Sequence, residues 1–208
     1  MKYKLSLESY LNRLKEKTEE HKVKLILENR VYFYEDKTTI GGYFSEEPLE
    51  LAVATRKKRK IWLPYLIHED SHLDQWIEQC QEWTNTQING TCASEIMPAW
   101  INGKEYPIET IKKAIISLKK MELDCERRAL RKIKKFNLPI NPQHYIKTAA
   151  INIHQYNYAL IRKKYPRKNK TLPYKNIKIL KTMPRTLRGN FNRLTKKQLE
   201  AFDEFTKN

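Results

Sequence analysis

The amino-acid sequence predicts an α+β fold, in which one helix and a run of short strands precede a series of helices. Three observations predict it. Apolar residues recur at helical spacing near the N-terminus, alternate with a period of two over residues 23–54, and return to helical spacing from Trp62 onward. The chain has 208 residues, of which 40% are apolar, so it is long enough to bury a core.

The first part of the chain contains the predicted sheet. Residues 5–20 carry the pattern of an amphipathic helix. The strands that follow are expected at residues 23–27, 31–34, 39–44 and 49–54. The basic block 56–60 should then be a solvated loop. We therefore expect a small mixed sheet of about four strands directly before the next helix.

The remainder is predicted to be mainly helical. One helix is expected over residues 62–83, and an irregular connection over 84–107, where prolines and Asn-Gly pairs recur. Further helices are expected over 108–136 and 143–164. A final short helix should begin at Thr195, because Thr-x-x-Gln has the form of a capping box.

The domain organisation follows from these elements and from the charge. Residues 1–140 are expected to form one domain, and residues 141–208 a basic helical C-terminal extension packed on it. Within the extension, three prolines mark an extended segment before the last helix: Pro166, Pro173 and Pro184.

The chain is strongly basic, with 41 Lys and Arg against 24 Asp and Glu and a net charge of +17. The segments 56–60 and 162–170 concentrate this charge. Such a field attracts nucleic acid largely without sequence preference. Abundant Lys, Asn, Ile and Tyr are equally a compositional habit of AT-rich genomes, so both interpretations stay open.

The sequence also bears on location. No apolar run approaches the roughly 20 residues that span a bilayer, and the N-terminus lacks the apolar stretch of a signal peptide. The three cysteines, an odd number without CxxC spacing, favour a reducing compartment. We expect a cytoplasmic protein with no membrane partner.

The segment from His68 to His72 has the form HExxH in an apolar helical context. On a helix, residues i and i+4 share one face, so both imidazoles can bind one ion and the glutamate between them can reach its bound water. The pattern predicts a zinc site with His68 and His72 as ligands and Glu69 as the catalytic carboxylate.

An ordinary amphipathic helix is the alternative. At about 100° per residue, Glu69 falls in the apolar arc of the helix. The polar arc opposite consists of Asp70, Ser71, Asp74 and Glu78. A glutamate that faces the core is costly unless it is paired or hydrogen-bonded, which favours the metal site.

A third ligand is expected on the helix over 108–136. There Glu122 takes a place where the apolar stripe demands a hydrophobic residue, and Glu126 lies at the edge of the stripe. The alternative for Glu122 is an exposed ion pair with Lys119. We expect Glu122 to be the ligand and weigh Glu126 as the other candidate.

Together the two segments resemble the gluzincin metallopeptidases. In that family the HExxH motif is followed by a second motif, a Glu with an Asp four residues later, to which residues 122–126 are similar. The resemblance implies Glu122 as third zinc ligand. It also implies that Glu126, in the usual place of the Asp, does not bind the metal itself but holds one of the histidine ligands.

Small zincin-like proteins of phages and bacteria are similar in size and plan. This likeness implies a minimal zincin domain in which residues 49–54 are the edge strand beside the cleft. It also implies a phage-encoded protein that acts in the host cell. No family pattern covers residues 140–208.

The predicted activity is hydrolysis of peptide bonds in a protein or peptide substrate by a zinc-activated water, with Glu69 as general base. The oxyanion needs a further donor, for which His154 and Tyr158, an i,i+4 pair, are the candidates. Two alternatives stay open: a basic nucleic-acid-binding protein with a structural or inactive zinc site, and a zinc protease positioned on DNA.

Overall fold

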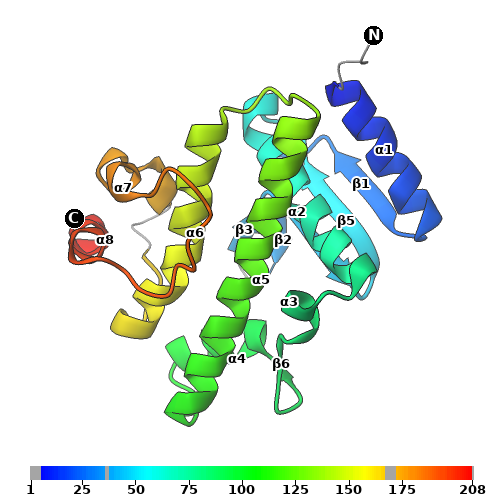
Figure 1. Cartoon of the computed structure of the whole chain (residues 1–208). Coiled ribbons are helices and arrows are strands. Elements are labelled where there is room, and N and C mark those ends of the chain that lie inside the picture. The colour runs from blue at the N-terminus through cyan, green and yellow to red at the C-terminus, as the bar shows by residue number, and fades with distance from the viewer. Residues whose placement is uncertain (1–5, 36–37, 167–171, 208) are drawn as a thin grey trace. The chain divides into compact units, whose positions relative to one another are not determined.

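The computed structural model describes residues 6–35, 38–166 and 172–207 (Figure 1). It has a mixed α+β fold with small sheets and many helices, which confirms the predicted class. None of the helices in these ranges is long and apolar enough to cross a membrane.

The chain forms two compact units. The first contains Met1–Gln79 and Cys125–Pro142, and the second contains Cys80–Asp124 and Gln143–Asn208. The long helix α5 (Ile108–Lys135) begins in the second unit and ends in the first. The predicted boundary between residues 140 and 141 lies close to Pro142, where the chain passes from the first unit to the second. The packing of a C-terminal extension on the rest of the chain stays a prediction.

The sheet of the first unit has three strands, in the order β1–β5–β4, and not the four that were expected. Strand β5 (Leu49–Ala54) pairs in parallel with β1 (Lys24–Glu28) and antiparallel with β4 (Gly42–Glu46). Strands β2 (Phe33–Glu35) and β3 (Thr38–Ile40) form a separate antiparallel pair. The expectation that residues 49–54 are an edge strand is therefore wrong.

Strand β5 is central because it is apolar on both faces. Its residues Leu51, Ala52, Val53 and Ala54 are all buried. On one face Ala52 and Ala54 pack with Phe33 of β2. Helix α2 (Arg59–Glu78) packs against β4 and β5, and helix α1 (Leu7–Glu20) lies beside β1 (Figure 1).

The ends of α2 differ from the prediction. The basic block 56–60 is a loop only up to Lys58, since α2 begins at Arg59. The helix stops at Glu78 because Gln79 adopts the left-handed conformation, with φ 46°, and donates its N–H back to the last turn. Helix α3 (Gln81–Thr84) is a separate element, so the predicted helix over 62–83 is too long.

The connection predicted to be irregular over 84–107 is mostly regular. Strands β6 (Gln87–Ile88) and β7 (Thr91–Cys92) form a hairpin around Asn89 and Gly90, whose φ angles of 52° and 79° suit a tight primed turn. Helix α4 (Ala93–Ile101) follows and contains Pro98. Its buried residues pack on the first part of α5 in the core of the second unit.

The last helices also show more order than was expected. Helix α6 (Pro142–Arg162) agrees with the prediction. The segment expected to be extended contains a 3₁₀ turn, η1 (Pro173–Lys175), and helix α7 (Ile177–Thr182). Before α8 (Lys196–Lys207), Thr195 N donates to Gln198 Oε1 at 2.9 Å and Gln198 N donates to Thr195 Oγ1 at 3.3 Å. The predicted capping box is confirmed.

Candidate metal centre

The two histidines of the HExxH motif meet on one face of α2. The Nε2 atoms of His68 and His72 lie 3.2 Å apart, and the rings are nearly perpendicular, at 88°. Zinc–imidazole bonds of about 2.0–2.1 Å at a tetrahedral angle place two ligand nitrogens about 3.3 Å apart. The spacing of the two Nε2 atoms therefore fits one zinc ion.

The outer nitrogen of His72 is held by Gln75. His72 Nδ1 lies 2.9 Å from Gln75 Oε1, and Gln75 is fully buried. Because an amide oxygen only accepts, this contact places the proton on Nδ1 and leaves the Nε2 lone pair toward His68. Sequence reasoning missed Gln75, although its i+3 spacing from His72 on the same helix could have revealed it.

The outer nitrogen of His68 faces two residues of α5. His68 Nδ1 lies 3.4 Å from Glu126 Oε1 and 3.5 Å from Cys125 Sγ, and Glu126 is only 3% exposed. Burial lowers the pKa of His68, but the interactions with Cys125 and Glu126 outweigh it and raise this pKa well above its usual value. A carboxylate at Nδ1 makes the other nitrogen a better metal ligand.

Cys125 is a further candidate ligand, since His68, His72 and Cys125 could together surround an ion. Cys125 also contacts His68 directly. Cys125 Sγ lies by Nδ1 of His68 and donates to the His68 carbonyl oxygen at 3.3 Å, whereas His72 faces Nε2. One ligand atom of each of the three residues lies within 4.8 Å of the others. Sequence reasoning gave Cys125 no role.

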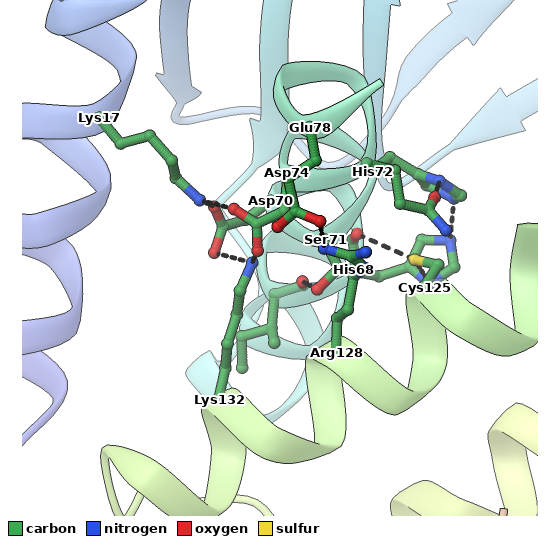
Figure 2. A network of polar contacts seen from close by, with 12 residues as sticks. Lys17, His68, Asp70, Ser71, His72, Asp74, Glu78, Cys125, Arg128 and Lys132 are labelled. Atoms are coloured by element: carbon green, nitrogen blue, oxygen red, sulfur yellow. Dashed lines mark hydrogen bonds and ion pairs between the residues drawn. The ribbon is translucent and has the colours of Figure 1, made fainter. Parts of the chain in front are cut away.

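The opposite side of α2 carries an ion network. This is the polar arc expected from the sequence, but its central residues are buried. Asp70 and Ser71 are 1% and 0% exposed. Both Asp70 and Asp74 pair with Lys17 of α1 and Lys132 of α5. In Figure 2 these aspartates turn toward the lysines, while the histidines lie on the other side of the helix.

This face of α2 is buried because α1 and the last part of α5 supply matching cations. Lys132 Nζ lies 2.6 Å from Asp70 Oδ2 and 2.7 Å from Asp74 Oδ2. Tyr10 of α1 donates its hydroxyl to Asp70 Oδ2 at 3.0 Å. The network thus joins three helices behind the HExxH motif and fixes the position of α2.

Glu69 is half-buried on α2. Glu122, the predicted third ligand, lies in the second unit, where it is half-buried and accepts a hydrogen bond from the Tyr156 hydroxyl at 3.3 Å. The alternative of an exposed Lys119–Glu122 pair is wrong. Lys119 is 6% exposed and donates to Asn157 Oδ1 at 2.7 Å and to two backbone carbonyls. The role of Glu122 as ligand stays a prediction.

The two predicted oxyanion donors also lie in the second unit. Buried His154 accepts from Asn157 Nδ2 at 3.0 Å, and burial, helped by the charge of Lys119, lowers its pKa to about 4. The Tyr158 hydroxyl donates to Asp203 Oδ1 at 3.1 Å on α8, and burial raises its pKa. His154 is therefore a neutral imidazole and Tyr158 holds α8. Their catalytic role stays a prediction.

Each of the two basic segments contains a cation with a defined partner. Lys57 Nζ lies 3.6 Å from the centre of the Tyr32 ring. In the segment 162–170, Arg162 Nε donates to Asp203 Oδ1 at 3.0 Å, and residues 167–170 lie outside the described residues.

Comparisons with protein-family models, with curated proteins and with solved structures found no match to this chain.

Proposed function

We propose that this chain is a zinc metallopeptidase that binds zinc through Nε2 of His68 and Nε2 of His72. The observation that carries the proposal is the 3.2 Å separation of these atoms, with both outer nitrogens already facing an acceptor. Two histidines paired only with each other would not require a buried amide and a buried carboxylate behind them. If a cation lies between the histidines, Gln75 and Glu126 orient the two ligand rings.

The residues around the histidines have separate tasks in this proposal. Gln75 keeps the proton of His72 on Nδ1, and Glu126 orients His68. Zinc held by these histidines would supply Lewis acidity that polarises a carbonyl and activates a water. Glu69 takes the proton of the attacking water and passes it to the leaving amine. The resemblance to gluzincins adds Glu122 as third ligand.

Zinc affinity of variants tests this ligand set. Wild-type protein should hold about one zinc per chain, and His72→Ala should lose it, because a three-ligand site then keeps only two ligands. Glu122→Ala should lower the zinc affinity far more than Glu126→Ala. Loss of Glu126, which only holds the outer nitrogen of His68, should cost about 10–100-fold, whereas loss of Glu122 removes a ligand. Metal content and competition with a chromophoric chelator measure both effects.

Glu78→Gln serves as control, because it removes a carboxylate from the same helix at a 54% exposed side chain. It should leave zinc affinity unchanged. A wild-type chain without zinc under non-chelating conditions would refute the proposal. If Glu126→Ala loses more affinity than Glu122→Ala, then Glu126 is the ligand and the gluzincin assignment of Glu122 is wrong.

A further inference from the structure

A cavity of about 450 Å³ lies in the first unit, between α1, α2 and the last part of α5. Three carboxylates line it, all from α2: Asp70, Asp74 and Glu78. Cations from α1 and α5 neutralise them. Lys17 and Lys132 pair with the two aspartates, and Arg128 Nη1 lies 2.7 Å from Glu78 Oε2.

Three more cations line the same cavity, namely Arg13 of α1 and Arg131 and Lys135 of α5. All three are exposed, and none forms an ion pair with another residue in the described part of the chain. The lining of the cavity therefore carries an excess of positive charge, while its acidic groups are already compensated. Arg131 and Lys135 are one helical turn apart, a spacing at which like charges repel.

A solvated helix face is the plain explanation of exposed cations, but it does not explain their arrangement. Residues 127–135 of α5 contain six Lys and Arg and no acidic residue. Of these, Arg128 and Lys132 pair with carboxylates of α2, while Arg131 and Lys135 line the same concave surface as Arg13 of α1. Converging cations in a cleft raise the local concentration of anions, which a convex face does not do.

We infer that this cavity is a nucleic-acid contact, at which Arg13, Arg131 and Lys135 bind backbone phosphates. Arginine matches a phosphate through two parallel N–H donors, and lysine binds it as a point charge. An extended polyanion fits better than a small phosphate ligand, because the three cations are exposed and the chain as a whole carries a charge of +17. This site is distinct from both basic segments singled out in the sequence.

The test compares two triple variants of the full-length protein with equal loss of charge. One is Arg13→Gln, Arg131→Gln, Lys135→Gln. The control is Arg56→Gln, Lys57→Gln, Lys58→Gln, in the same unit. Fluorescence anisotropy with a labelled DNA duplex at about 50 and 200 mM salt gives the slope of log affinity against log salt, which changes by about 0.9 for each phosphate contact.

Loss of three contacts should reduce the slope by about 2.7, so the affinity loss over this salt range becomes about 40-fold smaller than in wild type. The slope of the control should differ from that of wild type by no more than about 0.9, the value for one phosphate contact. Zinc content should be unchanged in both variants, which separates this inference from the metallopeptidase proposal.

Three results would overturn the inference: no duplex binding by wild type at the lower salt, an unchanged slope in the cavity variant, or an equal effect in the control. Displacement of the duplex by millimolar inorganic phosphate at constant ionic strength would also overturn it, since the ligand would then be a small phosphate. Thermal unfolding of the cavity variant should match wild type, because the three side chains are exposed.

Discussion

Glu69→Gln should keep the bound zinc and the fold while peptide hydrolysis falls by about 10²- to 10⁴-fold, the usual contribution of a positioned general base. The amide is nearly the same size as the carboxylate but cannot take the proton of the attacking water. Turnover of a quenched fluorescent peptide library by both proteins measures the loss, with metal content determined on the same samples.

Glu78→Gln is the matched control, because it makes the same chemical change in the same helix at an exposed pair with Arg128. It should keep wild-type turnover. Full activity in Glu69→Gln would remove Glu69 from the mechanism. Loss of zinc from that variant would show instead that Glu69 is a ligand.

Asp70→Asn should lower the free energy of unfolding by about 3–5 kcal/mol, the typical cost of removing one partner from a buried ion pair. Asp70 is 1% exposed and faces Lys17, Lys132 and the Tyr10 hydroxyl, so the amide leaves two cations with Asp74 alone. Urea unfolding in excess zinc, followed by tryptophan fluorescence, measures the change.

The same network gives a pH dependence. Burial raises the pKa of Asp70, but Lys132 and Lys17 outweigh it and hold this pKa below its ordinary value. The unfolded chain therefore binds the proton first as pH falls, and the advantage of wild type over Asp70→Asn should shrink below about pH 4.

Glu78→Gln again provides the comparison. Its pair with Arg128 is exposed, so its removal should cost about 1 kcal/mol or less. Equal destabilisation by the two substitutions would mean that Asp70 contributes no more than a surface charge. The network would then not explain how α2 is fixed.

Much of the candidate metal site could be predicted because it depends on local spacing. Four residues along a helix bring His68 and His72 to one face whatever the rest of the chain does. The inward position of Glu126 was visible in the same way, as a carboxylate at the edge of an apolar stripe. Its contact with His68 was not, because that contact joins two helices.

The errors arise where tertiary partners override a local pattern. Asp70 and Ser71 lie on the polar arc of a helical wheel, but lysines of α1 and α5 make burial of that arc favourable. The likeness to zincins implied an edge strand over residues 49–54, yet β5 pairs with β1 on one side and β4 on the other. Pro98 seemed to exclude a helix, but it lies within α4, whose apolar face packs on α5.

Helix α2 therefore has two different faces. One face presents two imidazoles, each held from behind, and the other is tied to α1 and α5 by buried ion pairs. For the proposed zinc site this means preorganisation, because neither ring would have to reorient to bind the ion.

Zinc K-edge X-ray absorption of the wild-type protein tests the central claim most directly. Zinc between the two Nε2 atoms should have only nitrogen and oxygen neighbours, at about 2.0–2.2 Å, with the scattering pattern of two imidazoles. A sulfur neighbour at about 2.3 Å would contradict the account, because Cys125 would then be a ligand and His68 would bind through Nδ1.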